Sequence, residues 1–336
     1  MIKIAVVILN WNGKKLLEQF LPAAIENSQS ASIFIIDNGS TDDSLAFLTK
    51  NYPQIKQIAL KKNIGYAGGY NLGLQSIDAK YYCLLNSDVL VTPNWLDPIL
   101  SHFDSNPNTG ILQPHILDYN KPEYFEYAGA AGGYIDRLGF PFCRGRIINT
   151  IEKDEGQYDA EKSIFWASGA CFFIRKSVFD SLKGFDADFF AHQEEIDLCW
   201  RAHNYGFDTI ALGTSKVYHV GGASLPVSPT KVYLNHRNSL YMLLKNLPNK
   251  KKYSMLFERL CWDGLIALGY LFQGKPKNLI SVIRAHVSFY KNFNKINKKR
   301  GVDIVNLNYF KTSNLLIAYY LLNIKKIASF ECRTLN

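Results

Sequence analysis

The sequence predicts an α/β fold in which helices flank a mainly parallel central sheet, and two patterns support this prediction. Within residues 1–120, short apolar runs alternate with helical segments, as they do in consecutive βαβ units. Three of the apolar runs end in polar clusters, and parallel strands bring such ends to one edge of a sheet. Ligands of open α/β sheets lie beyond that edge, so we expect the functional site there.

The individual elements follow from the period of the apolar residues and from the turn formers between them. Strands are predicted at 4–9, 32–36, 54–60, 81–85, 172–174 and 207–212, and helices at 14–27, 44–51, 68–76, from near 193, at 255–272 and at 313–327. Residues 106–162 place glycines, Pro141 and charges between short apolar pieces. We therefore expect a long loop or insertion there that covers the edge of the sheet.

Composition indicates a folded protein, with 336 residues of which 47% are hydrophobic and 20% charged. The first apolar run is short and no small-residue cleavage site follows it, so it is interpreted as a strand and not as a signal peptide. The six cysteines are scattered without a Cys-x-x-Cys pair. This spacing predicts reduced thiols in a cytoplasmic protein.

Charge divides the chain into two unlike parts. Residues 1–230 carry 19 Lys and Arg against 25 Asp and Glu, whereas residues 231–336 carry 19 against 4. We therefore expect a catalytic domain over 1–245 and a basic, amphipathic helical extension over 246–336. Such an extension suits an anionic membrane surface, or helices that pack on the domain, and no nucleic acid partner is expected because no nucleic-acid-binding module accompanies the charge.

The polar clusters at the strand ends each allow two interpretations. Asp88 follows a buried run through Asn86 and Ser87, so it is a candidate ligand for a metal or a phosphorylated group, or one of several turn formers before the next helix. Asp37 is a candidate acceptor for a base N–H or a ribose hydroxyl, or part of a polar turn before a helix. Asn10 ends the first run in the same way.

Two further stretches and one histidine carry candidate chemistry. A glycine-rich segment, 63–73, exposes backbone N–H groups for phosphate or lets the chain turn, but it lacks the Gly-Lys-Ser/Thr of a P-loop. Glu194, Glu195 and Asp197 fall at the start of a predicted helix, where the macrodipole favours carboxylates. His219 follows a predicted strand and is either a packed histidine or a metal ligand.

The order and spacing of these motifs resemble the inverting family 2 glycosyltransferases of the GT-A fold. The resemblance is carried by Asn10-Trp11-Asn12-Gly13, Asp37-Asn38-Gly39-Ser40, the Asn63 to Asn71 loop, Leu85-Asn86-Ser87-Asp88, the acidic motif and the segment from Trp166, and it covers about residues 1–245. Within this family the chain looks most like bacterial rhamnosyltransferase and galactofuranosyltransferase relatives.

The resemblance implies an activity and assigns roles to residues. A sugar would pass from a nucleotide-diphosphate donor, dTDP-rhamnose or a UDP-sugar, to a hydroxyl of a lipid-linked cell-surface glycan. The implied base is Glu195, with Glu194 as the alternative and Asp197 in the same motif, and Mg²⁺ or Mn²⁺ would be held by Asp88 and His219. The nucleotide site would comprise Asn10, Asp37, Asn63, Gly65, Gly68, Asn71, Asn86 and Asp88, and the acceptor side Trp166, Gly169 and Ala170.

Two other classes of function compete with this interpretation. A sugar nucleotidyltransferase usually carries a basic, glycine-rich loop after its first strand, which Asn10-Trp11-Asn12-Gly13 lacks. A non-catalytic membrane-associated scaffold of the same fold has no need of a base or a metal ligand. For the transferase we expect a cytoplasmic protein, peripheral on the inner face of the membrane. Its expected lipid contacts are Trp262, Tyr270, Phe272, Tyr319 and Tyr320, with 250–252, 298–300 and 325–326 on the phosphates.

Overall fold

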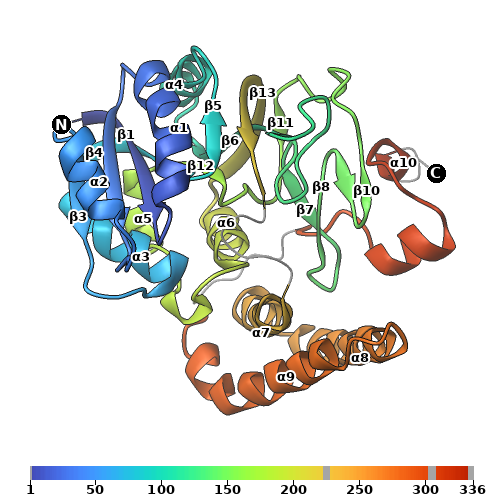
Figure 1. The fold of residues 1–336 in the computed structure, drawn as a ribbon. Coiled ribbons are helices and arrows are strands. Elements are labelled where there is room, and N and C mark those ends of the chain that lie inside the picture. The colour runs from blue at the N-terminus through green and yellow to red at the C-terminus, as the bar shows by residue number, and fades with distance from the viewer. Residues whose placement is uncertain (1, 222–227, 302–307, 332–336) are drawn as a thin grey trace.

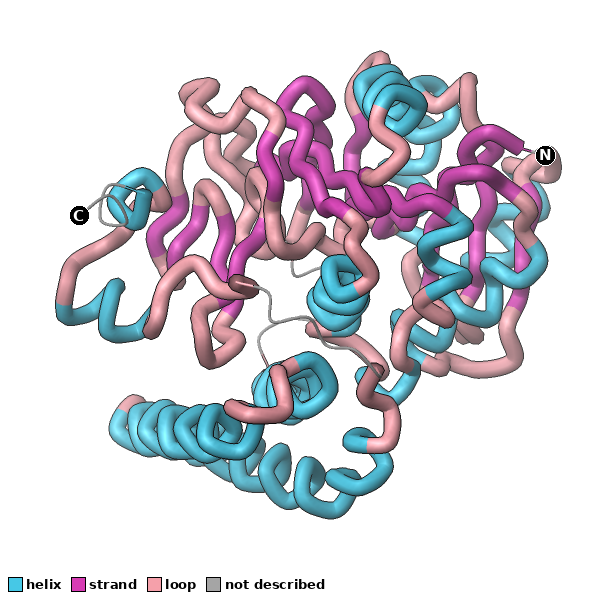
Figure 2. The backbone as a smooth tube through the Cα atoms, turned by 180° about the vertical axis from the view of Figure 1, so that it is seen from behind, coloured by secondary structure: helices cyan, strands magenta, loops and turns pink. Residues whose placement is uncertain are grey.

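The computed structural model describes residues 2–221, 228–301 and 308–331. A large mixed sheet fills one part of the molecule, and a smaller antiparallel sheet lies beside it (Figure 1). Three long helices form a layer on the side of helix α6 (Glu194–Asn204) that faces away from the large sheet (Figures 1 and 2).

The large sheet confirms the predicted α/β fold and has the strand order β11-β13-β6-β12-β4-β1-β2-β3, with β5 paired to β13. Strands β3, β2, β1 and β4 pair in parallel, as predicted. Strand β12 pairs antiparallel to both β4 and β6, so the remainder of the sheet is mixed. The strands are β1 (Ile2–Asn10), β2 (Ser32–Asp37), β3 (Lys56–Ala59), β4 (Ala79–Asn86), β5 (Val89–Val91), β6 (Thr109–Asp118), β11 (Lys162–Ser163), β12 (Cys171–Arg175) and β13 (Asp208–His219).

Helices cover both faces of this sheet because side chains alternate between the faces along each strand. In β4, Tyr81, Cys83 and Leu85 pack with α1 and α4, whereas Tyr82 and Leu84 pack with α3, α5 and α6. The helices of the N-terminal part are α1 (Lys14–Asn27), α2 (Ser44–Asn51), α3 (Gly65–Gly73), the 3₁₀ turn η1 (Leu74–Ser76), α4 (Leu96–Ser105), α5 (Lys176–Ser181) and the 3₁₀ turn η2 (Ala187–Phe189).

The prediction of a long loop over residues 106–162 was wrong. The segment begins with β6, a strand of the large sheet, and continues into the small sheet of β7 (Gly133–Ile135), β8 (Pro141–Cys143), β9 (Arg146–Ile147) and β10 (Thr150–Ile151). Strand β6 escaped recognition because Gln113, Pro114 and His115 interrupt its apolar run. The register with β13 shifts next to Pro114, and a proline is tolerated at such an irregularity.

The C-terminal part is helical but is not one unit. Helices α7 (Pro229–Asn246), α8 (Lys252–Phe272) and α9 (Pro276–Asn297) pack together, and no helix among the described residues is long and apolar enough to cross a membrane. The single helix predicted over 313–327 is interrupted, with a π-helical turn η3 (Ile317–Leu321) followed by α10 (Ala328–Glu331). These turns lie beside the small sheet (Figure 1), and Phe330 contacts Phe142 there.

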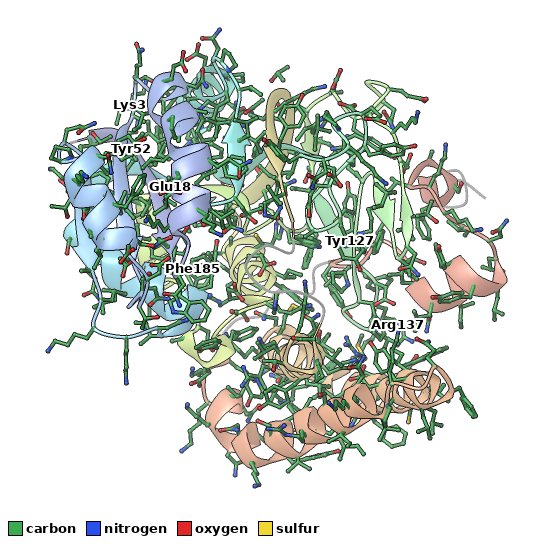
Figure 3. All side chains as sticks on the ribbon, in the orientation of Figure 1. Lys3, Glu18, Tyr52, Tyr127, Arg137 and Phe185 are labelled. Atoms are coloured by element: carbon green, nitrogen blue, oxygen red, sulfur yellow. The ribbon has the colours of Figure 1, made fainter. Side chains whose placement is uncertain are left out.

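An ion pair joins the small sheet to the helical layer. Arg137 follows β7 and lies on the side that faces α8 (Figure 3). Its guanidinium contacts the carboxylate of Glu258 on α8. The cysteines agree with the expectation of free thiols. Of the five that lie in the described residues, all are free and Cys261 alone is exposed, while Cys332 lies outside them.

Candidate active site

The polar ends of three parallel strands meet at one edge of the large sheet, as the sequence predicts. Asn10 of β1 and Asp37 of β2 are register partners, and Leu9 of β1 is the partner of Asn86 of β4. Strand β1 therefore lies between the other two, and Asp88 follows one turn beyond the end of β4. A ligand beyond this edge can reach all three polar clusters.

Asn10 and Asp37 form a buried hydrogen-bonded pair. The Asn10 amide donates to one Asp37 oxygen at 2.9 Å, and the other oxygen accepts from the backbone N–H of Ser40 at 2.9 Å. The Asn10 side-chain oxygen is buried and has no hydrogen-bond partner among the described residues. A buried amide oxygen that accepts no hydrogen bond has lost its bonds to water without replacing them. The Asn10 oxygen is therefore available to accept a hydrogen bond from a ligand.

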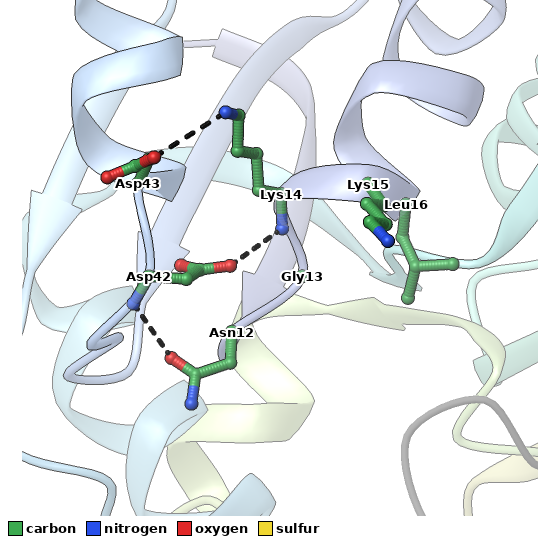
Figure 4. Close-up of a pocket in the computed structure, with 7 residues that line it drawn as sticks. All are labelled: Asn12, Gly13, Lys14, Lys15, Leu16, Asp42 and Asp43. Atoms are coloured by element: carbon green, nitrogen blue, oxygen red, sulfur yellow. Dashed lines mark hydrogen bonds and ion pairs between the residues drawn. The ribbon is translucent and has the colours of Figure 1, made fainter.

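An open hollow lies between the loops that follow β1 and β2 (Figure 4). Its volume is about 350 Å³, and it is lined by Asn12, Gly13, Lys14, Lys15, Leu16, Asp42 and Asp43. Asn12 bridges the two loops through its side-chain oxygen, which accepts from the backbone of Thr41 at 2.7 Å. Ser40 links this hollow to the Asn10–Asp37 pair, because its hydroxyl oxygen accepts from the Asn10 amide and from the Asn12 N–H. The volume is enough for part of a nucleotide.

The glycine-rich segment packs on the protein's own backbone. Gly65 has a φ of +79°, and a Cβ there would lie 2.3 Å from the carbonyl oxygen of Phe190, so only glycine fits. Asn63 accepts from the Gly65 N–H at 2.8 Å, and Asn38 donates to Asn63 at 3.1 Å. A Cβ on Gly68 would meet the Ile64 side chain at 3.2 Å. The segment thus holds the loop after β2 against the turn that precedes α6.

Asn71 faces away from the edge of the sheet. Its amide donates to the Phe185 carbonyl at 2.7 Å, and its oxygen accepts from the Phe185 N–H at 2.9 Å. Phe185 packs on Tyr66 and Tyr70 of α3. Both the nitrogen and the oxygen of the Asn71 amide are thus hydrogen-bonded to the backbone of Phe185. Asn71 therefore shapes the site by holding the loop that contains Phe185, and does not offer a free group to a ligand.

Asp88 and His219 come together although 131 residues separate them, because β5 and β13 pair in the large sheet. The His219 Nε2 lies 3.1 Å from Asp88 Oδ1, and both side chains are buried. Glu126, from the loop after β6, lies 3.4 Å from His219 Nδ1 on the other side of the ring. Burial lowers the pKa of His219, but the two carboxylates outweigh this effect and raise it to about 10.

This arrangement fits a divalent cation. Adjacent ligands of an octahedral Mg²⁺ or Mn²⁺ site lie about 3 Å apart, which is the spacing of Asp88 Oδ1 and His219 Nε2. The second Asp88 oxygen is buried without a hydrogen-bond partner among the described residues, so it is free to coordinate. Glu126 would fix the imidazole by accepting from Nδ1, as carboxylates do behind metal-bound histidines.

We expect the affinity for Mn²⁺ to rise with pH. The pKa of His219 is about 10, so at neutral pH an ion must displace its proton, and each unit of lower pH should weaken binding about tenfold. Titration calorimetry between pH 6.5 and 8 measures this slope. Asp159→Asn is a matched control, because Asp159 is a partly exposed carboxylate near a different histidine. A Mn²⁺ affinity that is independent of pH would contradict the assignment of His219.

A second group of potential ligands lies elsewhere. Atoms of His115, Asp154 and Asp159 fall within 4.8 Å of one another. The Lys216 ammonium already lies 2.9 Å from Asp154 and 3.3 Å from Asp159. The Lys216 ammonium therefore already supplies the positive charge that the two carboxylates require. A divalent cation fits better between Asp88 and His219 than in this second group.

The acidic motif begins helix α6 after a strained turn. Phe190, His192 and Gln193 all have backbone φ values between 65° and 72°, which residues other than glycine rarely adopt. Glu194 is buried, whereas Glu195 is partly exposed. Burial raises the pKa of Glu195 to about 7, and burial together with the neighbouring Glu195 raises that of Glu194 well above its usual range. With a pKa of about 7, Glu195 is a carboxylate for a substantial part of the time at neutral pH.

Asp197 has the surroundings of a structural residue. It is fully buried, and its oxygens accept from Arg201 at 2.9 Å, Lys245 at 2.8 Å and Asn246 at 2.9 Å. Burial alone would raise its pKa, but the cationic Lys245 and Arg201 hold it below its usual value. A carboxylate whose oxygens are already saturated positions α6 against α7 and does not take up a substrate proton.

The segment predicted for the acceptor side connects the other clusters. The Tyr66 hydroxyl donates to the Gly169 carbonyl at 2.8 Å, and the Asn86 N–H donates to the Ala170 carbonyl at 3.0 Å. Burial raises the pKa of Tyr66, and the negative charges of Glu194 and Glu195 add to the effect. Trp166 itself is buried, with its indole N–H donating to the Tyr134 carbonyl at 2.9 Å. It supports the segment from behind.

Two residues of the site were not identified from the sequence. Glu126 stands alone in an irregular stretch, and only the fold brings it to His219. Lys245 marks the predicted domain boundary, yet its ammonium contacts both Asp186 and Asp197. A lysine that the fold buries against two acids at the end of a helix cannot be told from a solvated one by sequence pattern.

Comparisons with known proteins give the family. The glycosyl transferase family 2 model matches residues 5–183, which is more than half of the chain. The N-acetylglucosaminyl-diphospho-decaprenol L-rhamnosyltransferase of Mycobacterium tuberculosis is 28% identical over 258 residues, covering 71% of this chain and 83% of that protein.

Solved structures share the fold. Residues 1–349 of S. aureus TarS in complex with UDP-GlcNAc give a TM-score of 0.57 at 15% identity, covering 89% of this chain and 84% of that one. The mannosyltransferase PcManGT from Pyrobaculum calidifontis, in complex with GDP-Man and Mn²⁺, gives a TM-score of 0.51 at 13% identity. The match covers 86% of this chain and 75% of that one. Since the family model spans strands β1 to β12 with their polar ends, this chain belongs to glycosyl transferase family 2 and is a glycosyltransferase of the GT-A fold, similar to rhamnosyltransferases.

Proposed function

We propose that this protein transfers a sugar from dTDP-rhamnose or a UDP-sugar to a hydroxyl of a lipid-linked cell-surface glycan, with inversion at the anomeric carbon. The name of the M. tuberculosis relative supports a rhamnosyl donor and a polyprenol-linked acceptor. UDP-GlcNAc and GDP-Man in the two similar structures support a nucleotide-diphosphate sugar.

The donor would lie along the polar edge of the large sheet. Asp37 and Asn10 would accept hydrogen bonds from its base and ribose, since the Asn10 oxygen lacks a partner among the described residues. The pocket would be shaped by Asn63, Gly65, Gly68, Asn71 and Asn86. Mg²⁺ or Mn²⁺ at Asp88 and His219 would offset the charge that develops on the departing diphosphate.

Glu195 would act as the general base in a single in-line displacement. Its carboxylate accepts the proton of the acceptor hydroxyl while that oxygen bonds to the anomeric carbon and the diphosphate leaves from the opposite face. Burial and the neighbouring Glu195 raise the pKa of Glu194 well above its usual range, which makes Glu194 the less suited of the two acids to this role. Gly169 and Ala170, which are tied to Tyr66 and Asn86, would border the acceptor.

The observation that carries the proposal is the difference between the two neighbouring acids. Glu195 combines partial exposure with a pKa of about 7, which suits a base that works at neutral pH. We further propose that 1–245 is the catalytic domain and 246–336 the extension, and that a lipid-linked acceptor brings the enzyme to the inner face of the membrane.

A screen of nucleotide sugars tests the proposed function. The purified full chain is incubated with Mn²⁺ and each of dTDP-rhamnose, UDP-galactofuranose, UDP-GlcNAc and GDP-mannose, with a polyprenyl-diphosphate sugar as acceptor. We expect glycosylation from one donor, and loss of that product after exhaustive chelation. Nucleotide binding without transfer from any donor would favour a non-catalytic protein and contradict the proposal.

A further inference from the structure

Helices α8 and α9 expose a row of large apolar side chains on their outer faces. Successive members of each row are three or four residues apart, except for one step of eight, or about two turns, between Phe257 and Leu265, so each row lies on one face of its helix. They are Tyr253, Phe257, Leu265, Leu268 and Phe272 on α8, and Ile280, Ile283, Val287 and Tyr290 on α9, with exposed fractions between 48% and 88%. Clusters of exposed large apolar residues of this extent indicate an interaction surface.

The two rows meet at one end of the helical layer. Residues 273–275 turn the chain between α8 and α9, so the last turns of α8 lie beside the first turns of α9. Both helices lie outside α6 and away from the large sheet (Figures 1 and 2). Leu268, Phe272, Ile280 and Ile283, with Lys275 and Lys277 at the turn, form what we call the hairpin surface.

A buried ionic cluster fixes which faces point outward. Asp263 of α8 accepts from Arg259 at 3.0 Å, and it lies 2.9 Å from His236 of α7 and 3.4 Å from His286 of α9. Because one carboxylate joins three helices, rotation of α8 or α9 would leave a buried charge without its partners. The apolar rows are therefore held on the outside.

The charge around the hairpin surface has one sign. Residues 264–301 contain eight Lys and Arg and no Asp or Glu. Some of these cations are used within the protein, since Lys295 and Lys299 pair with Asp188 and Arg300 donates to backbone carbonyls. Lys275 and Lys277 are exposed at the turn and have no ion pair among the described residues. They remain available to an anionic partner.

The lipid contacts expected from the sequence need correction. Trp262, Tyr270 and Tyr319 are half-buried, so Phe272 and Tyr320 are the exposed members of that set. Lys252 is buried and donates to Asn297 at 3.1 Å. Tyr320 belongs to the turns that pack on the small sheet, apart from α8 and α9. Lys250, Lys251, Lys298, Lys325 and Lys326 of the basic runs are exposed. The hairpin surface combines exposed lysines with rows of exposed apolar side chains, and a lipid interface takes both.

We propose that the hairpin surface docks on an anionic lipid bilayer. Leu268, Phe272, Ile280 and Ile283 enter the boundary between headgroups and acyl chains, while Lys275 and Lys277 contact lipid phosphates. A second copy of the chain is a poor alternative occupant, because it would bring two strongly basic surfaces together. The inference deepens the membrane partner of the proposed function and rests on it for the lipid-linked acceptor.

Vesicle flotation of the full chain tests the docking without any sugar donor. In 0.1 M NaCl we expect binding to vesicles of phosphatidylcholine with 30% phosphatidylglycerol and at least tenfold weaker binding to phosphatidylcholine alone. Leu268→Ser with Phe272→Ser should lower the partition coefficient at least tenfold, and Lys275→Gln with Lys277→Gln about fivefold for each lysine. Tyr205→Ser is the control, because the exposed fraction of Tyr205, 62%, lies between those of Leu268 and Phe272 but this residue follows α6.

The outcomes separate docking from catalysis. Circular dichroism and thermal melting show that each variant is folded. Equal binding of the variants and the unaltered chain would overturn the proposal, as would a concentration-dependent dimer that Leu268→Ser with Phe272→Ser abolishes. Absence of transfer from every donor would refute the proposed function and leave the vesicle result to decide the docking by itself.

Discussion

Glu195→Gln is expected to lower kcat by about 10²- to 10⁴-fold, the range that removal of a general base produces. The amide keeps the size and the helix position of the carboxylate but cannot accept a proton. Donor binding should persist, because the polar edge formed by Asn10, Asp37 and Asp88 is untouched. Single-turnover transfer and a separate titration of the nucleotide sugar measure the two effects independently.

The pH dependence of the unaltered enzyme is a second test of whether Glu195 is the general base. A base must be deprotonated to act, and the pKa of Glu195 is about 7. With Mn²⁺ saturating at every pH, we therefore expect kcat/KM to fall about tenfold for each unit below pH 7 and to level off above it. Glu194→Gln is the matched control, and its kcat should fall by less than that of Glu195→Gln. If Glu194→Gln is inactive and Glu195→Gln retains the normal rate, the base is Glu194 and our assignment is wrong.

Asp197→Asn is expected to destabilise the fold by about 3 to 5 kcal/mol, because it leaves the buried Lys245 and Arg201 charges without their carboxylate. Urea unfolding followed by far-UV circular dichroism measures the change. The pKa of Asp197 is lowered in the folded protein, so this stabilisation is complete above about pH 4 and is lost as the pH falls.

Two variants sharpen this test. Asp43→Asn removes an exposed carboxylate that lies 3.6 Å from Lys14, and should change stability by less than about 0.5 kcal/mol. Lys245→Met in the Asp197→Asn background removes the stranded charge and should restore part of the loss. A stable Asp197→Asn protein that has lost transfer as completely as Glu195→Gln would show instead that Asp197 acts in catalysis.

Residues close in sequence thus receive different roles from their surroundings. Glu194, Glu195 and Asp197 all begin α6, and the family resemblance implies Glu195 as the base, with Glu194 as the alternative and Asp197 in the same motif. Lys245 and Asn246 arrive from the end of α7 and saturate Asp197. Glu194 is enclosed, and Glu195 retains partial exposure. The residue that is free to act follows from which neighbours the fold supplies.

The fold class was open to prediction because it depends on local patterns. The predicted helices over 14–27 and 44–51 coincide with α1 and α2, and the predicted strands coincide with β1 to β4 to within a few residues. Strand β6 and the small sheet were missed because polar residues and Pro114 interrupt their apolar runs. Their pairing partners lie far away in sequence, so no local period reveals them.

The sequence by itself determined the α/β class, the polar ends of β1, β2 and β4, and the family to which their order belongs. Only the tertiary structure decided that Glu126 lies behind His219, that Asn71 turns to Phe185 and that the apolar rows of α8 and α9 face outward. The physical reason is the range of the contacts. Strand ends follow from neighbours along the chain, whereas burial and charge pairing depend on residues that only folding brings together.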